Sequence, residues 1–431
     1  MGSQITDMRA SIAATFPKDM RQATTGESAV EKFARSGRRS WGRCVAILFA
    51  LVGQLQTWAA MPEEETLPAA LQNYDPSKLI RFNTLDQAEK KREQLIRWIW
   101  SGGLPVDVQP TVDRDIDPAV FEKHLSGLDA QLASGVDRLN ASVSPYDYHQ
   151  LMYFISPKVR TTNSRRLVIL NSGHRANGAF QYGVDQTANR LLRDGFHVLM
   201  TDMPLVGFNS DNSVILPGAN EETLFDARGT SGHNQMFAKL CPPVLPDGEV
   251  FRFFLEPFIQ GVNYFRKTVS DAGDVSFVGL SGGGWAGHMI AAVDVRIQTS
   301  FPVAGSLPLY LRPYSPGSRG DAEQMYEPLF KEVDADGDGI PETAAGVASW
   351  LEIYALGGLG PGRKQVQVLN FYDSCCFSTN VYLTYTAFLS ELVRDLGEGE
   401  WTIHSDRSHR AHMISTQVLS EVIIPQLTGQ K

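Results

Sequence analysis

The chain has 431 residues, of which 43% are hydrophobic, 20% are charged and 10% are aromatic. This composition excludes a disordered protein, and the length allows one large core or two smaller ones. The formal net charge is −9, and residues 60–431 carry 31 basic against 44 acidic side chains without a Lys/Arg stripe, which argues against a nucleic-acid partner.

Residues 1–59 contain the three parts of a secretory signal. Three arginines lie between Arg38 and Arg43, the ten residues 44–53 are uncharged and mostly apolar, and Thr57-Trp58-Ala59 offers a small-residue cleavage site. The apolar run is shorter than the ~20 residues of a bilayer span. We therefore expect a targeting segment, a secreted or periplasmic protein and no stable membrane span once the segment is removed. A retained anchor is the alternative.

Residues 60–136 are predicted to form a polar, helical N-terminal extension. Thr84 and Asp86 open a charged helix that runs to Trp100, and Gly102-Gly103-Leu104-Pro105 stops it. Two strand-like segments follow, at 137–143 and 148–156.

From residue 166 onward, short β-branched runs alternate with helical stretches. This alternation predicts βαβ units and an α/β fold, with a mostly parallel central sheet and helices on both faces. We therefore expect one catalytic domain over residues 137–431. The expected strands are 166–170, 196–200, 275–279, 297–303, 365–371 and 401–404, and the expected helices are 179–194, 249–270, 379–396, 415–426 and one starting at Gly282.

Two connections between predicted elements are unusually long, at residues 203–248 and 304–364. Connections without secondary structure are rarely longer than ~15 residues. Both follow strands at the carboxyl edge of the sheet, where open α/β sheets bind ligands. They are predicted to form a lid or cap over the site.

The segment Gly279-Leu280-Ser281-Gly282-Gly283 lies between a predicted strand and a predicted helix. A nucleophilic serine on a sharp strand-to-helix turn needs small neighbours, and Gly279 and Gly283 supply them two residues away on either side. The helix N-terminus favours developing negative charge. A glycine-rich turn with an ordinary serine is the alternative, and the strand and helix around it favour a nucleophile.

This arrangement resembles the α/β-hydrolase superfamily over roughly residues 137–427. Residues 202–209 look like the loop after the family's fourth strand, and residues 170–174 look like the oxyanion loop after its third. The family's chain order is nucleophile, acid, histidine. The resemblance implies a serine hydrolase of esterase or lipase type.

For the acid, the resemblance favours Asp373, which follows the strand 366–371; Asp395 and Asp406 are its competitors. For the base, it favours His412 over His409, because His412-Met413-Ile414-Ser415 matches a pattern common before the family's last helix. Asp373 would accept a hydrogen bond from the imidazole and stabilise the imidazolium.

The resulting hypothesis is an exported serine hydrolase that cleaves a small-molecule or polymeric carboxylic ester through an acyl-enzyme on Ser281. The backbone N–H groups of Gly282 and His174 would form the oxyanion hole. Alternatives are an amide, a lactone or a β-diketone as substrate, or a non-catalytic binding protein on the same scaffold. We expect no required cofactor.

Carboxylates at alternate positions, followed by glycine, resemble the start of a calcium-binding EF-hand loop. They are Asp334, Asp336 and Asp338. Position twelve is Ala345 instead of glutamate, so a solvated acidic turn is the alternative to a structural calcium site.

Outside the targeting segment, the cysteines are Cys241, Cys375 and Cys376. In a compartment that permits disulfides, either Cys241 pairs with one of the neighbours or Cys375 and Cys376 pair with each other. No cysteine spacing resembles a zinc site.

Overall fold

The computed structural model describes residues 66–117, 124–174, 182–317 and 320–429. The chain divides into the units Met1–Glu63 and Glu64–Lys431, and the second is described here. The expected targeting segment 1–59 therefore lies outside the described residues.

The N-terminal extension contains the expected helix, α2 (Leu85–Ile99). The Thr84 side chain caps α2 by accepting a hydrogen bond from the Gln87 N–H. Two short 3₁₀ turns precede it, η1 (Ala69–Leu71) and η2 (Pro76–Leu79). The extension is not wholly helical as predicted, because it also contains strand β1 (Thr111–Asp113) and the start of β2 (Ala133–Val143). Both strands join the central sheet.

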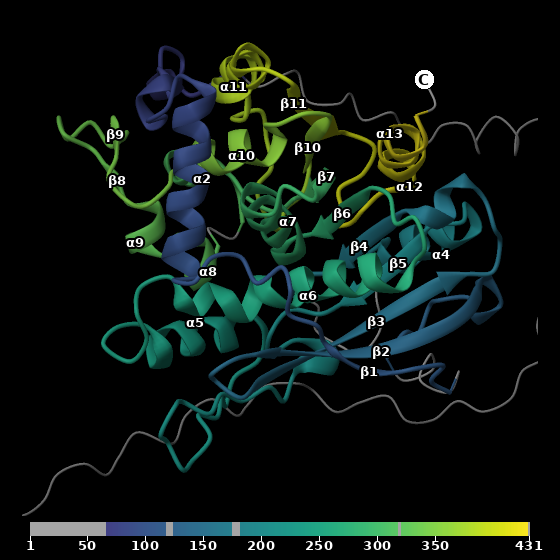
Figure 1. The fold of residues 1–431 in the computed structure, drawn as a ribbon. Coiled ribbons are helices and arrows are strands. Elements are labelled where there is room, and N and C mark those ends of the chain that lie inside the picture. Colours follow the sequence, from purple (N-terminus) through teal and green to yellow (C-terminus); the bar gives the residue numbers. More distant parts are fainter. Residues whose placement is uncertain (1–65, 118–123, 175–181, 318–319, 430–431) are drawn as a thin grey trace, which may run out of the picture. The chain divides into compact units, whose positions relative to one another are not determined.

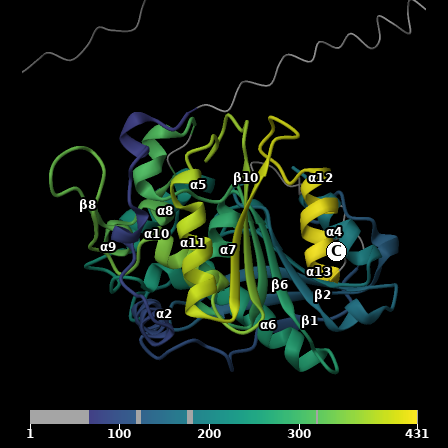
Figure 2. The same cartoon turned by 90° about the horizontal axis from the view of Figure 1, so that it is seen from above.

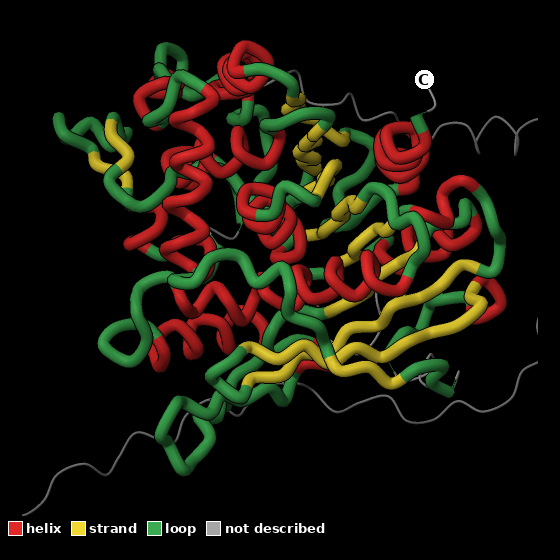
Figure 3. The backbone as a smooth tube through the Cα atoms, in the orientation of Figure 1, coloured by secondary structure: helices red, strands yellow, loops and turns green. Residues whose placement is uncertain are grey.

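The central sheet has nine strands in the order β1-β2-β3-β5-β4-β6-β7-β10-β11 (Figures 1 and 3). The pairs from β1 to β5 are antiparallel, and every pair from β5 to β11 is parallel. This topology confirms the predicted mostly parallel sheet. The remaining bounds are β3 (Tyr148–Pro157), β4 (Leu167–Asn171), β5 (His197–Thr201), β6 (Val275–Leu280), β7 (Ile297–Val303), β10 (Arg363–Asn370) and β11 (Gly399–Asp406).

Helices cover both faces of the sheet, as Figure 2 shows. One apolar core joins a face to α6 (Arg252–Thr268), α7 (Gly282–Val293) and α11 (Leu383–Leu396). The other core joins the opposite face to α4 (Val184–Arg193) and to the C-terminal helix, in which α12 (Thr416–Val418), a π turn η8 (Leu419–Ile423) and α13 (Ile424–Thr428) follow one another. The core strands are buried along their whole length because both their faces are covered.

The two long connections carry structure of their own. The first contains η5 (Gly207–Asn209) and α5 (Gly229–Leu240), and η6 (Glu249–Phe251) leads from it into α6. The second contains η7 (Leu309–Tyr314), α8 (Ala322–Met325), α9 (Glu327–Phe330), the two-stranded sheet β8 (Glu332–Val333) and β9 (Thr343–Ala344), and α10 (Trp350–Gly358).

Helix α10 corrects one expectation for the second connection. It is buried throughout and packs against α7, so it belongs to the layer that covers the sheet and not to a lid. The stretch around Trp350 and Tyr354 explains this position, because it is mostly apolar and its one charged side chain, Glu352, is buried against Arg81. Within the described part of the chain, no helix is both long and apolar enough to cross a bilayer.

Candidate active site

Ser281 occupies the turn between β6 and α7, where the motif predicted a nucleophile. Its backbone has φ 59° and ψ −125°, a conformation that costs a non-glycine residue on the order of 1–3 kcal/mol. Its N–H donates to the Val303 carbonyl at 2.9 Å, and its own carbonyl accepts from the Trp285 N–H at 3.0 Å, which begins α7. The turn is therefore fixed by the neighbouring strand and by the helix that follows.

The glycines that flank Ser281 are required by close backbone contacts. A Cβ added at Gly279 would lie 2.1 Å from the Gly283 carbonyl oxygen, and one added at Gly283 would lie 2.2 Å from the Asn171 carbonyl oxygen. Both distances are far below van der Waals contact. Steric fit at the turn therefore accounts for the Gly-x-Ser-x-Gly spacing.

Asp373 lies in the loop after β10 and is 1% exposed. Its Oδ1 accepts a hydrogen bond from the Cys375 N–H at 2.7 Å, and its Oδ2 lies 2.5 Å from Nδ1 of His412. The first contact orients the carboxylate and leaves the second oxygen for the imidazole. This is the arrangement that a triad acid needs.

His412 is held between two loops. Asn370 donates from Nδ2 to the Met413 carbonyl at 3.0 Å, and the Ile414 N–H donates to the Tyr182 carbonyl at 2.8 Å. Nε2 of His412 is buried, and no described residue provides it with a hydrogen-bond partner. With Nδ1 directed at Asp373, Nε2 is the nitrogen left to exchange a proton.

The competing pair, Asp406 and His409, has a different arrangement. Asp406 ends β11 and binds Nε2 of His409 at 3.0 Å, together with Ser408 and the helix-capping Ser415. Burial opposes charge on this carboxylate, but the hydrogen bonds from Ser408 and Ser415 outweigh burial and lower the pKa of Asp406. Asp406 therefore organises the loop that carries His412.

The expected oxyanion loop lies directly against the nucleophile turn. Gly173 has φ 68°, and a Cβ added there would lie 2.6 Å from the backbone nitrogen of Gly282. The ring of His174, the next residue, lies against Gly282 as well. The two segments predicted to supply oxyanion donors are therefore adjacent in space.

Ser281, His412 and His174 line one cavity of about 370 Å³. The structure thus brings the nucleophile, base and oxyanion candidates together, while His409 is not among the described lining residues. Residues from both long connections also contribute to the wall. The other lining residues are Tyr182, Thr230, Gly320, Asp321, Gln324, Cys375, Cys376 and Phe377.

Cys375 and Cys376, two of these lining residues, are joined by a disulfide in the structure. Cys241 is a free thiol, half-buried at the end of α5. The bridged pair directly follows the acid, and the Cys375 N–H is the donor to Asp373. The cysteines therefore take part in the loop that presents the carboxylate.

A second cluster next to the cavity was not anticipated from the sequence. Nε2 of His174 lies 2.9 Å from Asp321, 3.1 Å from Glu323 and 2.8 Å from Nδ1 of His233. Burial alone would lower the pKa of His174, but Asp321 and Glu323 outweigh it and raise that pKa to about 10. The four residues come from three distant segments, so no local motif could have revealed the cluster.

The acidic turn adopts a compact loop around its own carboxylates. Asp334 accepts hydrogen bonds from the N–H groups of Gly337 and Gly339, and the carboxylate oxygens of Asp334, Asp336, Asp338 and Glu342 lie within 4.8 Å of one another. Calcium binding there stays a prediction. Calorimetric titration with calcium that produced no heat would contradict it.

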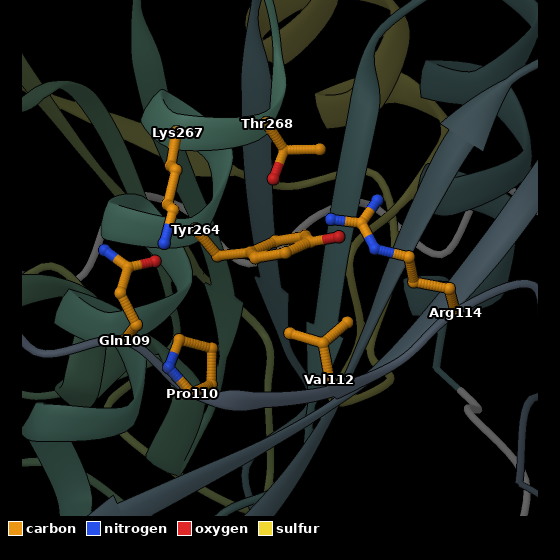
Figure 4. Close-up of a pocket in the computed structure, with 7 residues that line it drawn as sticks. All are labelled: Gln109, Pro110, Val112, Arg114, Tyr264, Lys267 and Thr268. Atoms are coloured by element: carbon orange, nitrogen blue, oxygen red, sulfur yellow. The ribbon is translucent and has the colours of Figure 1, made fainter.

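A separate hollow of about 320 Å³ lies between β1 and the end of α6 (Figure 4). Figure 4 shows Lys267 and Arg114 on either side of the Tyr264 ring. None of the described residues that line this hollow is a serine, histidine, cysteine or carboxylate. The cavity at Ser281 is therefore the better candidate for covalent chemistry.

No family model matches the sequence, and no curated protein matches it. Among solved structures, acetyl xylan esterase 1 from Thermoanaerobacterium sp. JW/SL YS485 is 12% identical, with 85% of this chain and 99% of that chain covered and a TM-score of 0.49. Methylesterase BT1017 is 14% identical, covering 78% and 61%, with a TM-score of 0.48. An acetyl xylan esterase from Paenibacillus sp. R4 is 12% identical, covering 84% and 99%, with a TM-score of 0.47.

The strand order, the turn after β6 and the acid and histidine loops after β10 and β11 define the architecture independently of these likenesses. They place the nucleophile, acid and histidine candidates in the chain order typical of one superfamily. The chain has the α/β-hydrolase fold.

Proposed function

We propose that the protein is a serine hydrolase that cleaves carboxylic esters through an acyl-enzyme on Ser281. One observation carries the proposal: Ser281 lies on a strained turn in the same cavity as His412, whose Nδ1 is held by the buried Asp373. Ser281 and His412 come from distant segments and line one cavity. Backbone strain such as that of Ser281 is typical of functional sites.

The reaction follows from these positions. Oγ of Ser281 attacks the ester carbonyl carbon while Nε2 of His412 takes its proton, and Asp373 stabilises the imidazolium. The backbone N–H groups of Gly282 and His174 donate to the oxyanion, each worth roughly 3 kcal/mol. The alcohol leaves with the proton from His412. Water then attacks the acyl-serine and gives its proton to His412. His412 returns that proton to Oγ of Ser281 as the carboxylic acid is released.

The cavity supports a short acyl group. A volume of about 370 Å³ is near the lower end of the roughly 300–1,000 Å³ typical of small-molecule sites. We therefore expect turnover of p-nitrophenyl esters to be fastest with acetyl and propionyl groups and to fall as the acyl chain lengthens.

Labelling with a fluorophosphonate probe tests the proposed nucleophile. The full chain should be labelled and Ser281→Ala should not, with Ser408→Ala as the control that keeps labelling. Labelling that survives in Ser281→Ala would refute the assignment. Labelling without turnover of any p-nitrophenyl ester would instead favour a specialised acyl substrate such as an amide, a lactone or a β-diketone.

We further propose export from the cytoplasm, which rests on the signal-like pattern in residues 1–59. Expression of the full chain followed by fractionation and N-terminal sequencing tests this proposal. A mature protein that begins near residue 60 in the extracellular or periplasmic fraction would support export. A full-length protein retained in the cytoplasm would contradict it.

A further inference from the structure

We propose that His174, His233, Asp321 and Glu323 form a zinc site that ties both long connections to the oxyanion loop. His174 follows β4, His233 lies on α5 in the first connection, and Asp321 and Glu323 lie at the start of α8 in the second. Helices α5 and α8 pack against each other (Figure 1). The structure thereby brings three segments, separated by about 60 to 150 residues of sequence, to one point.

The four side chains present one potential ligand atom each, and all four atoms lie within 4.8 Å of one another. Nδ1 of His233 is 2.8 Å from Oε1 of Glu323, and Nε2 of His174 is 2.8 to 3.1 Å from the other three ligand groups. Tetrahedral zinc with nitrogen and oxygen ligands needs roughly 3.3 Å between ligand atoms. Outward shifts of a few tenths of an ångström would therefore complete the site.

The contacts of His233 leave one of its ring nitrogens for the cluster. Nε2 of His233 lies 2.7 Å from the Pro204 carbonyl, so Nδ1 is the nitrogen directed at Glu323 and at His174. Nδ1 of His233 and Nε2 of His174 lie 2.8 Å apart. The two ring nitrogens therefore converge on one point, as the ligands of a single metal ion do.

A second observation also points to a cation. His233 and Glu323 are fully buried and Asp321 is nearly so, yet Oδ1 of Asp321 and Oε2 of Glu323 are buried without a hydrogen-bond partner among the described residues. When both imidazoles bind a metal through a nitrogen lone pair, the four ligand side chains together carry a charge of −2, which a divalent ion cancels. Two nitrogen and two oxygen ligands suit zinc better than calcium or magnesium, which prefer oxygen alone.

Metal bound here would act on the reaction by positioning. The His174 ring would bind through Nε2, while its other edge lies against Gly282 beside the nucleophile. Fixing that ring fixes the loop whose N–H we assign to the oxyanion hole. The inference does not depend on the esterase proposal, because metal binding is measured without any substrate.

The test is the zinc content of the full chain, measured by mass spectrometry after removal of metal with a chelator and reconstitution. We expect about one zinc ion per chain, and affinity at least about tenfold lower in His233→Ala and in Glu323→Gln. Asp336→Asn, in the separate acidic turn, is the matched control and should keep full zinc content. Equal zinc content in all four proteins would overturn the site.

Two measurements on the unmodified chain keep the test decisive if the variants fold poorly. Zinc should raise the melting temperature of the metal-free protein, and cobalt should give the strong visible absorption of a tetrahedral nitrogen–oxygen site. Absence of bound zinc together with an unchanged melting temperature would overturn the proposal. Preferential binding of a different divalent ion would overturn the assignment to zinc.

Discussion

Nδ1 of His412 lies 2.5 Å from Oδ2 of Asp373, whereas the other histidine of the same loop, His409, is paired with Asp406. The two pairs are built from similar residues but have different surroundings. His412 lines the cavity with Ser281, and Asp406 binds the Ser415 cap of the last helix. Variants of the His412–Asp373 pair should therefore change activity, and variants of the His409–Asp406 pair should change activity far less.

Asp373→Asn should lower kcat for an activated ester on the order of 10⁴-fold while leaving the fold intact. The amide cannot stabilise the imidazolium and can hold the wrong tautomer of His412. His409→Gln is the matched control, and we expect its kcat to stay within about threefold of the unmodified protein. Steady-state kinetics test this prediction. If kcat fell as far in His409→Gln as in Asp373→Asn, the assignment of His412 as the base would be wrong.

Replacing Ser281 by glycine should abolish activity and also stabilise the protein. The backbone at Ser281 has φ 59° and ψ −125°, which glycine adopts without the steric cost that a Cβ imposes. Ser281→Ala is equally inactive but keeps the Cβ and hence the strain. Urea unfolding should give the glycine variant about 1 kcal/mol more stability than the alanine variant. An alanine variant of equal or greater stability would mean that the turn is not strained.

The sequence predicted the fold and the triad candidates because their signals are local. Ser281 lies within a five-residue motif, and Asp373 and His412 each follow a strand whose apolar pattern is easily read. The family's chain order of nucleophile, acid and histidine then predicted that Asp373 pairs with His412, and the structure has this contact. The resemblance favours His412 over His409, and geometry completes the distinction, since both histidines lie in one loop and each is paired with a different aspartate.

The cluster around His174 and the burial of helix α10 could not be predicted, because neither has a local signal in the sequence. His233 and Glu323 match no motif in their own segments and meet through the packing of α5 against α8. His174, expected only as an oxyanion donor, lies against both of them. The length of the connection 304–364 and its place after a strand predict a lid, but α10 within it is buried throughout and packs against α7. Long-range packing decides both features, and single-segment patterns do not encode it.

Reduction of the Cys375–Cys376 bridge should lower activity without unfolding the protein. The Cys375 N–H orients Asp373, so a change in this loop moves the carboxylate relative to His412. We expect a severalfold to roughly tenfold fall in kcat and little change in melting temperature. Cys241→Ser, treated with the same reductant, controls for the free thiol. If reduction changed neither activity nor stability, the disulfide would have no role in orienting Asp373.

His197→Phe should make the protein less sensitive to acid. His197 stacks on Phe154, and its burial, together with the nearby Arg160, lowers its pKa from 6.5 to about 4. A lowered folded-state pKa means that stability is complete above about pH 6.5 and is lost as the pH falls towards 4. The loss approaches roughly 1.4 kcal/mol per pH unit in that window. In His197→Phe, the free energy of unfolding should no longer fall with pH between about 6.5 and 4. His149→Phe, which changes an exposed histidine, should keep this pH dependence.

Glu332→Gln should have its effect on the alkaline side. Burial raises the pKa of Glu332 from 4.5 to about 8, although the positive charge of Arg312 offsets part of the shift. A carboxyl group with a raised folded-state pKa binds its proton more tightly when folded, so stability is complete below about pH 4.5 and is lost as the pH rises to 8. Glutamine mimics the neutral acid and should therefore melt higher than the unmodified protein at about pH 8.5, but not at about pH 4.5. Glu327→Gln changes an exposed carboxylate and controls for the change in net charge. If Glu332→Gln were less stable than the unmodified protein at about pH 8.5, the prediction would be contradicted, because the Glu332 carboxylate would then be charged and paired.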